Sequence, residues 1–235
     1  GRRQLVLRDG KSVDGLASSE GVQQGDPFGP LLFALGLRRP LQRIAARLGR
    51  HSRDVLTSAY LDDIFLGVRA EDLKRALEVA QEELATYGLA IRPDKCGVWG
   101  RDLDPSLVPH GVPYNPEGLT VLGAPIGSPL YIGATVDKKL ENRGYRLMDS
   151  LKELGHRQSS YQLLRLCARP IPTYWARLLP PSCEPVKQAL LRFDAALLSA
   201  FEETSGVGKL PPLQRRQAQL PLALGGFGLT SHHYT

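Results

Sequence analysis

The 235-residue sequence predicts an α+β protein, in which an antiparallel sheet with packed helices is followed by an all-helical region. Three observations carry this prediction: two short β-rich runs flank adjacent aspartates, helical spacing of apolar residues surrounds them, and the C-terminal half is mostly helical by periodicity. A hydrophobic content of 42% allows one core, or a core and a smaller helical domain. No apolar run approaches the length of a membrane span and no signal peptide is visible, so we expect no membrane partner.

Two adjacent carboxylates stand at a tight turn between the β-rich runs. Residues 55–60 read as one strand and residues 64–68 as its partner, which places Asp62 and Asp63 at the tip of a hairpin. Because Asp tolerates the positive φ that tight hairpin turns require, both side chains are expected to project out of the sheet. Hard divalent cations such as Mg²⁺ are held by one or two carboxylates plus substrate phosphates, so the pair is a candidate metal site. The alternative is a solvated turn, because Asp-Asp is a common surface dipeptide.

A glycine-rich, proline-punctuated loop at residues 21–30 runs directly into a predicted amphipathic helix. We expect Asp26 to be the N-cap of this helix and Pro27 its first helical residue, while Gly25 permits a ligand to approach the backbone closely. The apolar positions of the helix are Leu31, Leu32, Leu35, Leu41, Ile44 and Leu48. Loop and helix start are therefore expected to form one unit.

The remaining elements follow from periodicity and turn residues. A hairpin with an Asp-Gly turn is predicted between residues 4–7 and 12–16, and a helix from about Glu71 to Gly88. Residues 101–118, rich in Pro, Asp and Gly, read as an irregular connection. Two longer helices follow, with apolar positions at Val136, Leu140, Leu147, Leu151 and Leu154 and at Val186, Leu190, Phe193, Leu197 and Phe201.

Positive charge is concentrated in the C-terminal part. Residues 1–127 carry 16 Lys or Arg against 16 Asp or Glu, whereas residues 128–235 carry 14 against 8, so the whole net charge of +6 lies there. A basic helix surface facing nucleic-acid phosphates is one interpretation. Its residues would be Lys138, Lys139, Arg143, Arg146 and Lys152. The alternative is an ordinary solvated face, because acidic residues are interleaved with these cations.

Five segments resemble, in this order, motifs of the reverse transcriptase family, and most closely those of the non-LTR (LINE-type) retrotransposon enzymes. They are the Gln-Gly loop at 21–30, the x-Asp-Asp hairpin at 60–66, the run GLAIRPDKC at 88–96, the run LTVLGAPIG at 119–127 and the run LPLALGGFGL at 220–229. Each motif is weak alone, but five in one order are hard to attribute to chance. The resemblance implies a partial polymerase palm over residues 1–127, followed by an all-helical thumb and connection over residues 128–235.

The resemblance also implies a reaction. A primer 3′-hydroxyl attacks the α-phosphorus of a deoxynucleoside triphosphate and pyrophosphate leaves, with two Mg²⁺ ions, or Mn²⁺ in their place, at the reacting phosphate. The implied partners are an RNA or DNA template, a DNA primer and deoxynucleoside triphosphates. The residues carried over are Asp62, Asp63 and Lys95 as catalytic residues, Asp62 and Asp63 also as metal ligands, Gln24, Gly25 and Tyr60 for nucleotide binding, and Leu122 and Gly123 for the primer grip.

Two of these assignments have an ordinary structural alternative. Lys95 would donate a proton to pyrophosphate or pair with its charge, and the alternative is a solvated lysine in a turn. Tyr60 would pack beneath the primer end, whereas an aromatic residue in a sheet is more often part of the core.

One departure from the family pattern limits what this chain is expected to do alone. Reverse transcriptases hold their metals with a further aspartate on a strand that precedes the Gln-Gly loop, and the corresponding region would lie upstream of Gly1. We therefore expect the remainder of the same polypeptide as a partner, and a fragment that is inactive alone. Two other classes stay open: a non-catalytic nucleic-acid-binding module derived from such an element, and the palm of an RNA-directed RNA polymerase.

The number and spacing of the cysteines indicate the redox state of the cellular compartment. Cys96, Cys167 and Cys183 are odd in number and widely scattered, so neither a disulfide framework nor a zinc site is indicated. We expect free thiols in a reducing, intracellular compartment, which for a LINE-type element would be the nucleus.

Overall fold

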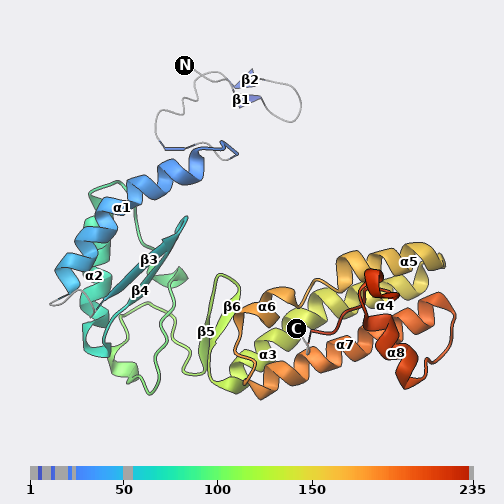
Figure 1. Ribbon diagram of the computed structural model, residues 1–235. Helices are drawn as coiled ribbons and strands as arrows, with labels where there is room; N and C mark the ends of the chain where they lie inside the picture. The colour runs from blue at the N-terminus through green and yellow to red at the C-terminus, as the bar shows by residue number, and fades with distance from the viewer. Residues whose placement is uncertain (1–4, 7–11, 14–20, 23–24, 50–54, 233–235) are drawn as a thin grey trace. The chain divides into compact units, whose positions relative to one another are not determined.

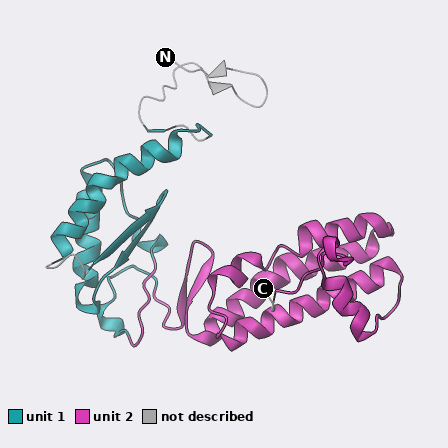
Figure 2. Cartoon of the chain, viewed as in Figure 1, with its two compact units in different colours: residues 1–96, 103–113 teal, residues 97–102, 114–235 magenta. Residues whose placement is uncertain are grey.

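The computed structural model describes residues 5–6, 12–13, 21–22, 25–49 and 55–232 of the chain (Figure 1). They form helices and short antiparallel hairpins, which confirms the predicted α+β class. The chain divides into two compact units, residues 1–96 with 103–113 and residues 97–102 with 114–235 (Figure 2). The boundary between palm and thumb at residue 127 stays a prediction.

In the first unit, two helices cover one face of a β-hairpin. The hairpin pairs β3 (Leu56–Tyr60) with β4 (Asp63–Gly67), and the helices are α1 (Gly29–Leu48) and α2 (Leu73–Ala85). Ala59, Ile64 and Leu66 pack against buried helix residues, because alternate side chains of a strand point to the same face. The buried helix residues are Leu37, Ile44, Leu48, Ala76, Val79, Ala80 and Leu84. One apolar core therefore holds the hairpin on its helices.

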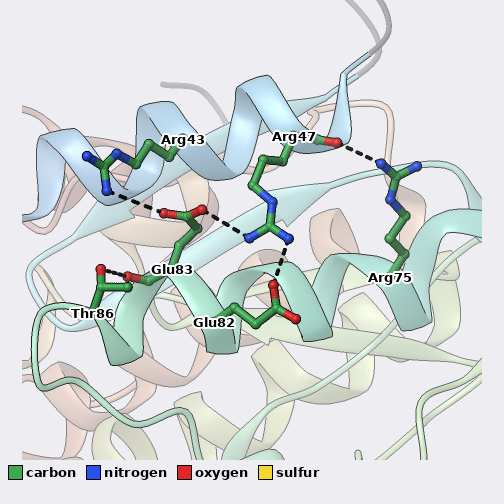
Figure 3. A network of polar contacts seen from close by, with 6 residues as sticks. All are labelled: Arg43, Arg47, Arg75, Glu82, Glu83 and Thr86. Atoms are coloured by element: carbon green, nitrogen blue, oxygen red, sulfur yellow. Dashed lines mark hydrogen bonds and ion pairs between the residues drawn. The ribbon is translucent and has the colours of Figure 1, made fainter.

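Ion pairs and hydrogen bonds join α1 to α2 outside this core (Figure 3). The Arg47 guanidinium donates to the carboxylates of Glu82 and Glu83 at 2.6 and 3.0 Å, and Arg43 lies 3.9 Å from the other Glu83 oxygen. The hydrogen bonds that Arg47 donates to Glu82 and Glu83 raise the pKa of its guanidinium. Arg75 of α2 donates to the Arg47 carbonyl at 2.9 Å, which satisfies one of the carbonyls left without a partner at the C-terminal end of α1.

The N-terminus of α1 differs from the prediction. The helix begins at Gly29, and Asp26 is not its N-cap. The Asp26 side chain instead accepts a hydrogen bond from the Phe28 amide at 2.9 Å, and its carbonyl accepts from the Gly29 amide at 3.0 Å. This local turn satisfies the backbone before the helix begins, so Pro27 lies outside the helix.

Only part of the predicted apolar face of α1 is buried. Leu31, Leu32 and Leu35 are 53–56% exposed, whereas Ile44 and Leu48 lie in the core as predicted. The first turns of α1 are apolar on several sides, so periodicity alone does not indicate which side packs.

Short elements complete the first unit. β1 (Leu5–Val6) pairs with β2 (Ser12–Val13) as predicted, and the Asp-Gly turn between them lies outside the described residues. The 3₁₀ turns are η1 (Ala70–Asp72), which leads into α2, η2 (Pro93–Lys95) and η3 (Pro105–Leu107).

The second unit is a hairpin followed by helices. The hairpin pairs β5 (Gly118–Val121) with β6 (Ala124–Gly127). The α-helices are α3 (Pro129–Leu140), α4 (Arg146–Glu153), α5 (Arg157–Leu163), α6 (Thr173–Leu178), α7 (Glu184–Ser205) and α8 (Pro212–Gln219). Two π-helical turns, η4 (Glu141–Tyr145) and η5 (Leu164–Ala168), continue α3 and α5, and a 3₁₀ turn, η6 (Leu222–Leu224), follows α8.

Helix α7 forms the centre of the helical core. Phe193 and Leu197 on α7 and Val136 and Leu140 on α3 are at most 1% exposed. Gly144 in η4 makes room for Phe193, because a Cβ at this position would lie 2.3 Å from the ring. These contacts confirm the apolar positions that the sequence predicts for both helices, except Leu154, which follows the last residue of α4 and is 47% exposed.

The C-terminal segment is fastened back onto the helices. The Asp194 carboxylate on α7 is buried and accepts from the Ser231 hydroxyl, accepts from the His232 amide at 2.8 Å, and pairs with His232 Nδ1 at 2.9 Å. His232 Nε2 lies 3.5 Å from the hydroxyl of Thr173, the first residue of α6. The segment therefore links α6 to α7.

In the part of the chain that the structure describes, no helix combines the length and the apolarity needed to cross a membrane. Cys96, Cys167 and Cys183 are free thiols.

Candidate active site

The β3–β4 hairpin presents the two adjacent aspartates in different backbone environments. Tyr60 is paired directly with Asp63, so the turn consists of Leu61 and Asp62 alone. The positive φ of the turn, 54°, falls on Leu61 and not on either aspartate, which corrects the sequence-based expectation. Asp63 is already the first residue of β4, where the strand ladder holds its backbone. Asp62 lies in the turn itself.

The face of the hairpin that points away from the core carries Tyr60 and Asp63. Because Ala59 and Ile64 point to the core, their neighbours Tyr60 and Asp63 share the opposite face. Tyr60 is 61% exposed, so the alternative that it belongs to the core is wrong. Asp62 and Asp63 are exposed too, and among the described residues neither carboxylate has a hydrogen bond or ion pair. The tip of the hairpin therefore concentrates negative charge that no described cation neutralises.

The chemistry of this donor set fits a hard divalent cation. Carboxylate oxygens are the ligands that Mg²⁺ and Mn²⁺ prefer, and Mg²⁺ sites need only one or two of them when substrate phosphates complete the coordination. The described residues contain no group of three or more His, Cys, Asp or Glu that could hold a metal. Asp62 and Asp63 therefore form a partial donor set, which leaves coordination positions open to phosphates, water and further ligands.

Lys95 lies in the same compact unit as Asp62 and Asp63. The structure describes no contact between Lys95 and either aspartate. It is the last residue of η2 and is exposed, and neighbouring Asp94 is engaged by Arg92 at 2.7 Å. The Cys96 thiol donates to the Arg92 carbonyl at 3.3 Å, and burial together with the negative charge of Asp94 raises the pKa of this thiol. Lys95 is thus an unpaired cation within the described part of the chain.

The other residues expected at the nucleotide pocket are only partly described. Gln24 lies outside the described residues. Gly25 is exposed with φ at +90°, and nothing lies within 4 Å of a Cβ built there. The glycine is therefore required by its backbone conformation and not by lack of room.

The residues expected at the primer grip lie in the second unit, at the turn between β5 and β6. Leu122 and Gly123 have φ of 49° and 83°, the pattern of a two-residue hairpin turn in which both residues are left-handed. Their carbonyls accept hydrogen bonds from Tyr174 and Trp175 of α6. No local pattern in the sequence points to these two aromatic residues, because the turn that they contact lies 52 residues away.

The chain is similar to reverse transcriptases over its first half. The profile of the family described as "Reverse transcriptase (RNA-dependent DNA polymerase)" matches residues 3–126, a stretch that contains every residue expected at the site. Among curated proteins, the Retrovirus-related Pol polyprotein from type-2 retrotransposable element R2DM of Drosophila melanogaster is 32% identical over 91 residues. The Retrotransposable element SLACS 132 kDa protein of Trypanosoma brucei gambiense is 31% identical over 90 residues.

These relatives are much longer than this chain. The matched regions are 37% and 38% of this chain but only 9% and 7% of the respective relative, so the chain covers less than a tenth of either protein. No solved structure matches the chain significantly.

Proposed function

The chain belongs to the reverse transcriptase (RNA-dependent DNA polymerase) family, of the non-LTR retrotransposon type, and we propose that it supplies the catalytic carboxylates of template-directed primer extension. The observation that carries this proposal is the β3–β4 tip. Asp62 and Asp63 stand there side by side on an exposed hairpin, with no described cation to neutralise them. A phosphoryl-transfer site needs such charge to hold metal ions beside a triphosphate.

Asp62 and Asp63 are the proposed ligands of two Mg²⁺ ions, with Mn²⁺ as the alternative. When bound, the ions would neutralise the reacting triphosphate and activate the primer hydroxyl. Asp62 is the main direct ligand in this proposal, and Asp63, held in the strand ladder opposite Tyr60, supports it. The missing ligands would come from the remainder of the same polypeptide, so the chain alone is expected to be inactive.

Residues of the first unit are proposed to contact the incoming nucleotide and the pyrophosphate that leaves. Tyr60 offers an exposed ring on the face that Asp63 shares, which supports a role beside the nucleotide and the primer end. Gln24 and Gly25 would line the pocket for the incoming nucleotide and the template. Lys95, exposed and unpaired in the described part, would donate a proton to pyrophosphate or pair with its charge.

The β5–β6 turn is the proposed primer grip. Among the described residues, the amide N–H groups of Leu122 and Gly123 have no hydrogen-bond acceptor, whereas both carbonyls are occupied. Consecutive free amides favour an anion, and a phosphate of the primer backbone supplies one.

The α3–α4 region is the proposed contact for the duplex backbone. Four cations there are exposed and have no ion pair within the described residues: Lys138, Lys139, Arg143 and Arg146. Lys152 differs, because it pairs with Asp149 at 3.3 Å and Glu203 at 3.1 Å. The free cations support phosphate binding, and the paired Lys152 fits a structural role.

The setting of the reaction is proposed from the resemblance. The template would be RNA or DNA, the primer DNA and the monomers deoxynucleoside triphosphates. Three free thiols support a reducing, intracellular compartment, which for a LINE-type element would be the nucleus.

Primer extension by the full-length polypeptide tests this function. Asp62→Asn keeps the size of the side chain and removes its charge, and it is expected to lower extension at least 100-fold, in line with the loss of one electrostatic catalytic group. Asp102→Asn is the matched control, because Asp102 is exposed with φ at 53°, a conformation that Asn also tolerates. Unchanged extension by Asp62→Asn would contradict the proposal. Duplex binding without extension by the unaltered protein would favour a non-catalytic nucleic-acid-binding module instead.

A further inference from the structure

Helix α6 directs two consecutive aromatic side chains at the two carbonyls of the β5–β6 turn. Tyr174 Oη donates to the Leu122 carbonyl at 2.7 Å, and Trp175 Nε1 donates to the Gly123 carbonyl at 3.2 Å. All four residues belong to the second compact unit. Two adjacent donors thus meet two adjacent acceptors across a separation of 52 residues.

The two donors are themselves held in place. Trp175 is 5% exposed and belongs to the core of the second unit, so its indole N–H has a fixed direction. The rings of Tyr174 and Trp175 meet edge to face, with centroids 5.9 Å apart and planes at 79°. The first residue of α6, Thr173, lies 3.5 Å from the buried ring of His232. Helix α6 is therefore anchored at its start and through Trp175.

Occupied carbonyls determine which way the turn faces. In a trans peptide the N–H points away from the C=O, so a Leu122 carbonyl bound to Tyr174 leaves the Gly123 N–H pointing away from that side chain. Both turn residues are in the left-handed region, which Leu disfavours, so the turn needs outside support to keep this conformation. The hydrogen bonds from α6 supply that support.

We propose that Tyr174 and Trp175 are positioning residues for the primer. By holding both turn carbonyls, they fix the conformation of the turn and the direction in which the Gly123 amide meets the primer backbone. This inference rests on the proposed primer-grip function of the turn. Because both donors belong to α6, the second compact unit sets the orientation of the turn. The β3–β4 hairpin, which carries Asp62, belongs to the first unit.

The test is Tyr174→Phe in the full-length polypeptide, which removes one hydroxyl and keeps the ring. Primer extension is measured with primer–template and deoxynucleotide varied separately. The KM for primer–template is expected to rise roughly 2- to 10-fold, the factor for one neutral hydrogen bond. The KM for the nucleotide is expected to stay unchanged, and the thermal midpoint is expected to fall only by what one hydrogen bond contributes, because the buried Trp175 and the rest of the core are untouched.

Tyr161→Phe is the matched control. The Tyr161 hydroxyl donates to the Phe227 carbonyl at 2.9 Å, so this variant removes a bond of the same kind from the same unit, away from the turn. It is expected to leave the KM for primer–template unchanged. Equal effects of Tyr161→Phe and Tyr174→Phe would overturn the positioning role.

Gly123→Ala separates this inference from the function on which it rests. At φ of 83° any Cβ strains the turn, so this variant perturbs the primer grip directly and is expected to raise the KM for primer–template. If Gly123→Ala raises this KM and Tyr174→Phe does not, the primer grip stands and the positioning role is wrong. If neither variant changes it, the turn does not bind the primer and both proposals are wrong.

Discussion

Leu61 and Leu122 occupy the same unfavourable conformation in two different hairpins. Each is the first residue of a two-residue turn, with φ of 54° and 49°. The left-handed region costs an L-residue roughly 1–2 kcal/mol, and such strain persists mainly where the surrounding structure or function requires it. Leu61 separates Tyr60 from Asp62, so its strained backbone sets the direction of a proposed metal ligand.

Leu61→Gly is expected to stabilise the chain. Relief of about 1–2 kcal/mol of strain exceeds the roughly 0.5–1 kcal/mol that the greater freedom of glycine costs on folding. Urea denaturation should therefore give a free energy of unfolding about 0.5–1 kcal/mol higher than that of the unaltered protein.

Leu56→Gly is the control for this substitution. Leu56 is also exposed, but it lies in β3 without a positive φ, so glycine there is expected to destabilise the chain. A loss of stability in Leu61→Gly as large as that in Leu56→Gly would contradict the account of the turn.

Glu202 is a buried carboxylate, and its hydrogen-bond partners affect its pKa more than its burial does. Burial alone raises its pKa, but hydrogen bonds from Arg215, both at 2.8 Å, and from the Leu210 amide at 3.0 Å leave the pKa below its ordinary value. A folded-state pKa below the unfolded value means that Glu202 contributes stability above the unfolded pKa of about 4.3. This contribution is lost as the pH falls through the folded-state pKa.

Glu202→Gln is therefore expected to lower the free energy of unfolding by about 2 kcal/mol at pH 7, because Arg215 loses a charged acceptor. The difference from the unaltered protein should shrink below pH 4, and urea denaturation across this pH range measures it. Glu203→Gln is the control: its partner Lys152 and its own side chain are 38% and 55% exposed, so an effect under about 1 kcal/mol is expected. A pH-independent effect of Glu202→Gln would rule out this linkage.

At the scale of the element, the β3–β4 hairpin follows closely from its sequence. Runs of strand-forming residues on both sides of the aspartates predict the two strands, and the observed bounds differ from the predicted ones by one residue. The residue with positive φ could not be predicted in the same way. The pairing of Tyr60 with Asp63 shortens the turn, so the first turn position falls on Leu61 and not on an aspartate.

The predicted N-cap of α1, Asp26, is wrong because a local turn competes for the same side chain. Asp26 is a good N-cap by residue type, but the same side chain can close a local turn, and it does so with Phe28. Likewise, contacts between α6 and the β5–β6 turn could not be predicted, because they depend on tertiary packing between elements that are distant in sequence.

For the exposed cations of α3 and α4 we predict how the binding of a duplex depends on salt concentration. Lys139→Gln and Arg146→Gln each remove an exposed, unpaired cation, and each is expected to weaken binding of a primer–template duplex and to reduce the salt dependence of log affinity by up to about 0.9. The fluorescence anisotropy of a labelled duplex, measured at salt concentrations between about 50 and 200 mM, gives the slope of log affinity against log salt concentration.

Lys152→Gln is the matched control, because Lys152 lies on the same helical stretch but is paired with two carboxylates. Its salt slope is expected to match that of the unaltered protein. If all three variants give the same slope, this surface does not contact phosphates, and the exposed cations are an ordinary solvated face.

At the scale of the whole molecule, the residues expected to take part in the reaction are found in both compact units. The carboxylates and Lys95 belong to the first unit, and the β5–β6 turn belongs to the second. The order of motifs along the chain indicates the family, and the match over residues 3–126 confirms it. A third metal ligand stays a proposal, because the matched regions cover less than a tenth of the longer relatives.

Metal preference tests the assignment of Asp62 most directly. In the full-length polypeptide, Asp62→Cys replaces a hard carboxylate oxygen by a thiolate, which binds Mg²⁺ poorly and softer ions well. Primer extension by this variant is expected to be lost in Mg²⁺ and recovered in part in Mn²⁺ or Cd²⁺, whereas Asp102→Cys should stay active in Mg²⁺. Full activity of Asp62→Cys in Mg²⁺, or no recovery in any ion from a folded variant, would contradict metal binding by Asp62.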